Sequence, residues 1–355
     1  MDCTKNRSKI LRSKVIKISK YTFFVLVVMV VIGFIFPTWT PNIKGKQSIS
    51  TLEQVEINGT ELEVMIRGVD QNNPIILFVH GGPGCSEIPY VRKYQDQLEE
   101  NFTIVHYDQR GSGKSYHFFE DYSNLSTDLH VEDLLALTEY IKDRFSQQKV
   151  LLIGHSFGTY IGMKAAAEAP EHFFAYIGIG QVADSEMSER DSLEYTLKQA
   201  RFAENVKDVR KLESLRESVE TGEQLTPRNL VRKYGGAARL INDNLDYYTG
   251  FLFNPEYNLL DVVRYLKGVS ISQEILLPER KKQNIIKIVT KLDLPVYFVM
   301  GQYDYMTSVD AAKAYFEELE APVKEFVLFE KSAHYPQFEE EDEFAEWLNR
   351  TLEEL

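Results

Sequence analysis

A serine lies at a sharp turn between a predicted strand and a predicted helix. The segment 154–158 reads Gly-His-Ser-Phe-Gly, with Ser156 at its centre, after an apolar run at 149–153 and before a small-residue run at 159–166. A G-x-S-x-G turn in this context exposes the serine hydroxyl, and its glycines let strand and helix pass close together. A serine hydroxyl becomes a nucleophile when a base lies beside it. The pattern therefore predicts Ser156 as a nucleophile for acyl transfer.

The base should be a histidine that follows this serine along the chain, after the acid. Only His172 and His334 come after Ser156. His172 falls between a predicted helix and the next strand, where a solvated surface residue is expected. His334 follows the strand-like run 323–329, and a loop at the carboxyl end of a late strand is a suitable place for a base. We therefore predict His334 as the general base.

The acid should lie between these two residues, also at the end of a strand. The apolar run 294–300 is typical of a buried strand and is followed by Asp304. We predict Asp304 as the acid of the triad. Asp310 is the alternative, although it is better placed to open a helix at its first turn.

A glycine-rich loop provides candidate donors for developing negative charge. The run 75–79 is apolar and β-branched, and 80–84 reads His-Gly-Gly-Pro-Gly. An oxyanion needs two backbone N–H groups that are already oriented toward it. We predict that these are the N–H groups of Gly82 and of Phe157, the residue after the nucleophile.

The elements that must position these residues alternate along most of the chain. Strand followed by helix predicts an α/β fold with a mostly parallel sheet and helices on both faces. The pair Asn58-Gly59 predicts an antiparallel hairpin near the start. Strand-like runs disappear between residues 184 and 291, which predicts a helical insertion. Strands are expected at 62–67, 75–79, 103–107, 150–153, 174–179, 296–300 and 325–329, and helices at 128–145, 160–168, 311–319 and 344–352.

Together these motifs resemble the α/β-hydrolase fold, and within it the proline iminopeptidase (prolyl aminopeptidase) branch of serine hydrolases. The resemblance rests on segments 80–84, 108–115, 154–158, 301–304 and 333–336, and it covers 53–355. It implies an aminopeptidase that acts on peptide N-termini. A carboxylesterase or acyl-amide hydrolase that needs no free amine is the alternative, followed by a non-catalytic surface binding protein. The turn also carries His155 and Phe157, where the best-known prolyl peptidases often have Gly and Trp.

The resemblance further implies that the insertion 184–291 is a cap that covers the active site. In an aminopeptidase the cap should hold a carboxylate that pairs with the substrate's ammonium group. Among Glu186, Glu189 and Glu194 we predict Glu189 for this role. Four aromatic residues of the cap are candidates to line the pocket or to pack on the core: Tyr247, Tyr248, Phe251 and Phe253.

The N-terminal part of the chain predicts a membrane anchor. Residues 1–20 carry seven basic residues and one acidic residue, and 21–36 is uncharged and apolar. We predict a basic cytoplasmic tail at 1–20 and a transmembrane signal-anchor at 21–36, because no small-x-small cleavage site follows. A cleaved signal peptide is the rival interpretation. A polar linker at 37–52 would then lead to an extracellular hydrolase domain.

The hydrolase domain itself is expected to comprise 53–183, the cap 184–291 and a second core part at 292–355. The whole chain has a net charge of −13, so residues 21–355 carry −19. Such acidity argues against nucleic acid as a partner. The substrate is expected to be a peptide or a small ester or amide. No metal or cofactor motif is found: Gly113-Lys114-Ser115 resembles a P-loop end, but Asp108 stands where that loop needs glycine.

Overall fold

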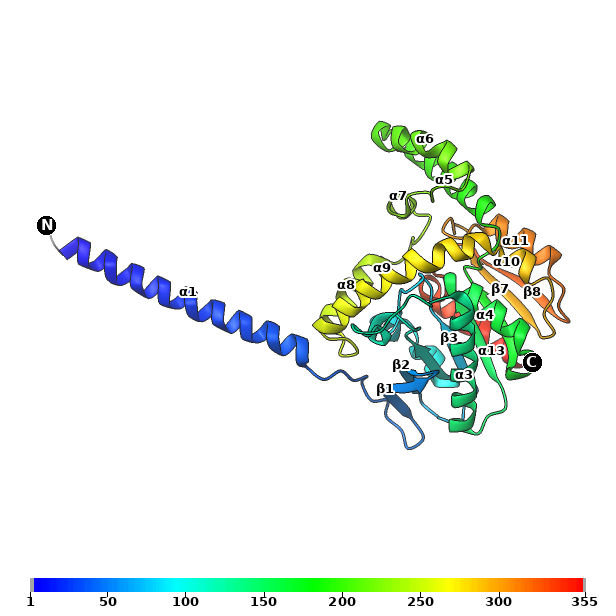
Figure 1. The fold of residues 1–355 in the computed structure, drawn as a ribbon, viewed down its shortest axis with the longest axis horizontal. Helices are drawn as coiled ribbons and strands as arrows, with labels where there is room; N and C mark the ends of the chain where they lie inside the picture. Colours follow the sequence, from blue (N-terminus) through cyan, green and yellow to red (C-terminus); the bar gives the residue numbers. More distant parts are fainter. Residues whose placement is uncertain (1–2, 354–355) are drawn as a thin grey trace.

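The computed structural model describes residues 3–353, and the side chains of residues 14–353. Its centre is an eight-stranded sheet in the order β1-β2-β4-β3-β5-β6-β7-β8, with helices on both faces (Figure 1). The predicted α/β architecture is thus confirmed. The strands are β1 (Ile49–Ile57), β2 (Thr60–Gly68), β3 (Ile75–Val79), β4 (Thr103–Tyr107), β5 (Val150–His155), β6 (Phe173–Ile179), β7 (Val296–Gly301) and β8 (Lys324–Phe329).

The first two strands form the predicted antiparallel hairpin. Ile57 pairs with Thr60 across a two-residue turn in which Asn58 and Gly59 both have positive φ, 48° and 76°. This conformation matches the right-handed twist of a hairpin, and Asn-Gly adopts it readily. β2 also pairs antiparallel with β4, and the pairs from β4 to β8 are parallel.

β1 begins at Ile49, inside the segment 37–52 that was expected to be linker. Its first residues are half-buried, because this strand lies at the edge of the sheet, and they show no continuous apolar run. The strand forms because its backbone pairs with β2 along its whole length. Cross-strand pairing of this kind leaves little trace in hydrophobic periodicity.

The alternation of side chains along β3 shows how the two faces are filled. Ile75, Leu77 and Val79 belong to one core cluster, and Ile76 and Phe78 to another. Successive side chains of a strand point to opposite faces. The first cluster packs against α3 (Thr127–Phe145), α4 (Phe157–Glu168) and α11 (Val309–Glu318), and the second against α2 (Asp96–Asn101) and α13 (Glu341–Glu353).

Helices alone connect β6 to β7. They are α5 (Ser185–Phe202), α6 (Val206–Glu220), α7 (Arg228–Lys233), α8 (Asp243–Phe253), α9 (Leu259–Lys282) and α10 (Ile285–Ile288). The pair α5 and α6 extends away from the sheet, whereas the long α9 lies across the body of the molecule (Figure 1). The predicted boundaries of the cap and core parts stay predictions.

The N-terminal helix α1 (Cys3–Ile35) extends away from the sheet as a long rod (Figure 1). Its segment Lys14–Ile35 is long and apolar enough to cross a membrane, and none of it is buried in the protein. Its end touches the cap, because a Cβ at Gly33 would lie 2.7 Å from Leu259 Cδ1. Of the predicted tail 1–20, residues 1 and 2 lie outside the described residues, and α1 runs through the rest.

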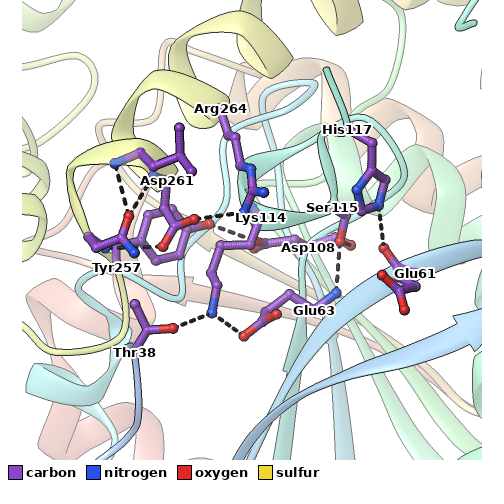
Figure 2. A network of polar contacts seen from close by, with 12 residues as sticks. Thr38, Glu61, Glu63, Asp108, Lys114, Ser115, His117, Tyr257, Asp261 and Arg264 are labelled. Atoms are coloured by element: carbon purple, nitrogen blue, oxygen red, sulfur yellow. Dashed lines mark hydrogen bonds and ion pairs between the residues drawn. The ribbon is translucent and has the colours of Figure 1, made fainter. Parts of the chain in front are cut away.

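The segment after α1 is held against the domain by a polar network (Figure 2). Lys114 Nζ donates to Thr38 Oγ1 at 2.8 Å and pairs with the buried carboxylate of Glu63. Beside it, Asp108 accepts a 2.5 Å hydrogen bond from the hydroxyl of Tyr257, just before α9. Burial raises the pKa of Asp108 to about 7. The motif that resembled a P-loop therefore joins the linker, the sheet and the cap.

Candidate active site

Ser156 lies at the apex of the turn from β5 to α4. Its backbone has φ 54° and ψ −123°, a positive φ that L-residues rarely adopt, and its N–H donates to Ile179 O at 2.9 Å. A Cβ at Gly158 would lie 1.9 Å from the carbonyl oxygen of Val79, so only glycine fits where α4 crosses β3. Strained backbone of this kind is common at functional sites.

Asp304 and His334 meet at the carboxyl ends of β7 and β8. His334 Nδ1 lies 2.8 Å from Asp304 Oδ2, and both side chains are buried. The other oxygen of Asp304 accepts hydrogen bonds from the N–H groups of Met306 and Thr307. Burial alone would raise the pKa of Asp304, but His334 and the hydrogen bonds from the hydroxyl and N–H of Thr307 outweigh it and hold that pKa below its usual value. Asp304 is therefore an anion that can orient the imidazole of His334.

A cavity of about 360 Å³ joins these groups, because Ser156, His334, Gly82 and Phe157 all line it. Phe157 is the first residue of α4, so its N–H has no partner within the helix. Gly82 has a φ of 120°, and a Cβ there would lie 2.6 Å from the backbone nitrogen of Cys85. Four of the five residues predicted for the triad and the oxyanion hole thus line one cavity, and the fifth, Asp304, contacts His334.

The pair of His155 and Glu87 was missed by sequence reasoning. His155 Nδ1 lies 2.5 Å from Glu87 Oε1, and its Nε2 lies 3.0 Å from the carbonyl oxygen of His334. Both neighbours are acceptors, so both ring nitrogens carry protons. Burial disfavours this charge, but Glu87 outweighs it and raises the pKa of His155. The same pairing overcomes burial at Glu87 and lowers its pKa.

Glu189 does not lie where an ammonium-binding group was expected. It is not among the residues that line the cavity of Ser156. Its buried carboxylate pairs with Arg228 and accepts a 2.8 Å hydrogen bond from the N–H of Thr226. The prediction for Glu189 is therefore corrected: its carboxylate stabilises the cap by joining α5 to the start of α7. Only the folded cap reveals this pairing, because the partners are 39 positions apart.

The remaining candidates, the aromatic residues of the cap and the alternative acid and base, differ in whether they line the cavity or lie at the surface. Tyr247 lines the cavity, and Phe251 packs on Tyr265 with ring centroids 4.8 Å apart. Tyr248 and Phe253 are exposed. Among the polar alternatives, Asp310 is exposed in the first turn of α11, and His172 lies 2.7 Å from the ammonium of Lys142.

Charged side chains in the cavity bear on what it can bind. Among the described residues that line it, Glu87 is the one acidic side chain, and His155 already pairs with it. Within the described part of the chain, no group of three or more His, Cys, Asp or Glu residues could hold a metal ion. The arrangement can support attack by a serine on a carbonyl group.

Known proteins resemble this chain along most of its length. A family model described as the alpha/beta hydrolase fold matches residues 74–341. The probable aminopeptidase YbaC of Bacillus subtilis is 32% identical over 311 residues, which cover 87% of this chain and 98% of that protein. The proline iminopeptidase of Saccharolobus solfataricus is 22% identical over 328 residues, which cover 84% of this chain and 91% of that protein. The crystal structure of the Mycobacterium smegmatis proline iminopeptidase matches with a TM-score of 0.62 at 15% sequence identity. The match covers 86% of this chain and 98% of that protein.

Proposed function

Because this chain belongs to the alpha/beta hydrolase fold family, we propose that it is a serine hydrolase with the triad Ser156, Asp304 and His334. The observation that carries the proposal is the buried Asp304–His334 pair at the edge of the cavity that Ser156 also lines. A nucleophile at a strained turn, a histidine and an anion that orients it are the parts that acyl transfer requires.

The reaction follows from these positions. Ser156 Oγ attacks the scissile carbonyl carbon while His334 takes its proton through the ring nitrogen that does not face Asp304. The N–H groups of Gly82 and Phe157 donate to the oxygen on which negative charge develops. His334 then gives its proton to the leaving amine or alcohol, and an acyl-enzyme remains. A water molecule, activated by His334, releases the acyl group and restores the serine.

We favour an aminopeptidase of the proline iminopeptidase type as the specific activity. The names of the relatives support this assignment, since both carry an aminopeptidase or iminopeptidase activity in their names. Such an enzyme needs a carboxylate for the substrate's ammonium group. Glu87 is the acidic group available in the cavity, and it would have to share its charge with His155.

A carboxylesterase or acyl-amide hydrolase that needs no free amine is the second candidate. It is favoured by one observation, the engagement of Glu87 by His155, which leaves the cavity without an unpaired acidic side chain among the described residues. The same triad and oxyanion donors would serve both reactions. The two candidates differ in whether a free amine is needed.

We further propose that α1 anchors the enzyme in the cell membrane, with the basic residues of 1–20 in the cytoplasm and the hydrolase domain outside. The apolar segment Lys14–Ile35 supports this, since it is long enough to span a bilayer and is unburied. Basic residues that flank a span remain on the cytoplasmic side.

Hydrolysis by the full chain in neutral detergent separates the two activities. The substrates are the p-nitroanilides of proline and alanine, their N-acetylated forms, and p-nitrophenyl butyrate. Cleavage of the free-amine substrates that acetylation abolishes would establish the aminopeptidase. Cleavage of the ester and of both anilide forms alike would leave the serine hydrolase in place and exclude the need for a free amine.

A further inference from the structure

Three arginines face the cavity of Ser156. Arg228 comes from the start of α7, Arg232 from the same helix, and Arg280 from the last turns of α9. The single acidic side chain described there, Glu87, is balanced by the protonated His155. The lining of this cavity is therefore cationic, although the chain as a whole is strongly acidic.

Two of these arginines have acidic partners that lie outside the cavity lining. Arg228 pairs with Glu189, and Arg232 Nη2 lies 2.7 Å from Asp243 Oδ2. Each acidic partner orients its guanidinium group and compensates its charge, and neither partner lines the cavity. The pair formed by Arg228 is incomplete, because its Nη1 is buried and has no hydrogen-bond partner.

Arg280 differs from both. No hydrogen bond or ion pair within residues 14–353 reaches its guanidinium group, and its Nε is buried without a partner. Burial lowers the pKa of Arg280, and the positive charge of Arg228 adds to this effect while Glu189 opposes it. Arg280 is half-buried, and a guanidinium nitrogen that is buried without an acceptor is costly, so such nitrogens are normally paired. Arg280 and Arg228, which each have one buried nitrogen without a partner, both line the cavity that also contains Ser156.

We propose that the guanidinium groups of Arg280 and Arg228 bind a carboxylate group of the substrate while its scissile carbonyl lies at Ser156. Guanidinium groups and carboxylates form paired, charge-assisted hydrogen bonds, which fix orientation as well as supply energy. The substrate class is then a small acidic acyl compound, such as a short peptide with its free C-terminus or a dicarboxylic acid half-ester or half-amide. A cavity of about 360 Å³ suits a molecule of that size.

This inference rests on the proposed serine hydrolase and names its substrate class. The hydrolytic test compares the mono-p-nitrophenyl ester of glutaric acid with the same ester in which the free carboxylate is a carboxamide. Full-length protein in neutral detergent should show a kcat/KM about ten-fold or more higher for the acid. In Arg280→Gln this ratio should fall to about one, and in Arg280→Lys to an intermediate value. The ratio within each variant cancels any general loss of activity.

Arg201→Gln is the matched control, because Arg201 is exposed on α5, pairs with Glu213 and does not line the cavity. It should keep the wild-type ratio. Labelling of Ser156 by a fluorophosphonate and the circular dichroism spectrum report whether each variant is folded. A wild-type ratio near one, or an unchanged ratio in Arg280→Gln, would overturn the carboxylate site while leaving the serine hydrolase intact.

A binding measurement keeps the inference testable if no ester is cleaved. Calorimetry on full-length Ser156→Ala should detect glutarate but not neutral glutaramide, and the added Arg280→Gln change should abolish the glutarate signal. Absence of glutarate binding, or equal binding of inorganic phosphate, would contradict a carboxylate site. Failure of Ser156 to react with the fluorophosphonate would instead contradict the proposed function, so the two failures are distinguishable.

Discussion

Nδ1 of His155 lies 2.5 Å from Oε1 of Glu87, at the residue that immediately precedes the nucleophile. The other ring nitrogen of His155 donates to the carbonyl oxygen of His334. One imidazolium therefore connects three segments that must keep their positions: the turn of Ser156, the chain after the glycine-rich loop, and the loop of the general base. We infer that this pair positions the catalytic groups without touching the reacting atoms.

Glu87→Gln should destabilise the folded protein by about 3 kcal/mol, because it leaves a buried imidazolium without its anion. The effect depends on pH. Because the pKa of His155 is raised in the folded state, its contribution to the free energy of unfolding is fully present below about pH 6.5. That contribution is lost as pH rises through the raised pKa. Because the pKa of Glu87 is lowered in the folded state, its contribution to the free energy of unfolding is fully present above about pH 4.5. That contribution is lost as pH falls through the lowered pKa.

Denaturant unfolding at several pH values measures this difference, which should be greatest between about pH 4.5 and 6.5. Glu56→Gln is the control, because Glu56 is exposed on β1. An equal effect of both substitutions at pH 6 would contradict the ion pair.

Asp304→Asn should lower kcat by about 10⁴-fold, because an amide cannot stabilise the imidazolium and favours the wrong tautomer of His334. The matched change is Asp310→Asn on the exposed first turn of α11, which should leave kcat near the wild-type value. Steady-state kinetics on any cleaved ester provides the measurement. The assignment of the acid is wrong if Asp310→Asn, rather than Asp304→Asn, loses activity.

Asp108→Asn should stabilise the protein at neutral and alkaline pH. Burial raises the pKa of Asp108 to about 7 from its usual value of 3.8, so the folded state binds a proton more tightly than the unfolded state. The contribution of Asp108 to wild-type stability should therefore fall as pH rises from about 4 to about 7. The asparagine variant lacks this slope and should gain on the order of 4 kcal/mol at pH 8 relative to pH 4. Melting temperatures of both proteins at pH 4 and pH 8 test this prediction. The same change in melting temperature between the two pH values for wild type and Asp108→Asn would exclude it.

The full chain should stay in the membrane pellet after an alkaline carbonate wash, because α1 would span the bilayer. A variant with Val27→Lys and Val30→Lys in this helix should be released, since charges at the centre of a span are costly. A protease added to intact cells from which the cell wall has been removed should digest the hydrolase domain. Release of the wild-type chain, or full protection from the protease, would refute the proposed topology.

The sequence predicted the part of the site that local patterns encode. Ser156, Asp304 and His334 each follow an apolar strand run, so their positions at strand ends could be deduced from neighbours in the chain. The fold followed from the same alternation. The hairpin turn at Asn58-Gly59 was equally local.

Features that depend on distant partners could not be predicted. His155 and Glu87 are 68 positions apart, and neither lies in a pattern that reveals the other. Glu189 was predicted as a substrate ligand because it lies at the start of the cap, and its pairing with Arg228 becomes visible only once the cap is folded. The start of β1, residues 49–52, was expected to be linker because an edge strand depends on pairing with β2 rather than on its own apolar residues.

The most direct test of the central claim is to treat the purified full-length protein with a fluorophosphonate probe and locate the modified residue by mass spectrometry. We expect stoichiometric modification of Ser156 alone, its loss in Ser156→Ala, and a strong decrease in its rate in a His334 variant that retains the wild-type circular dichroism spectrum. An unmodified Ser156 in a folded protein, or modification that persists in Ser156→Ala, would contradict the serine hydrolase mechanism.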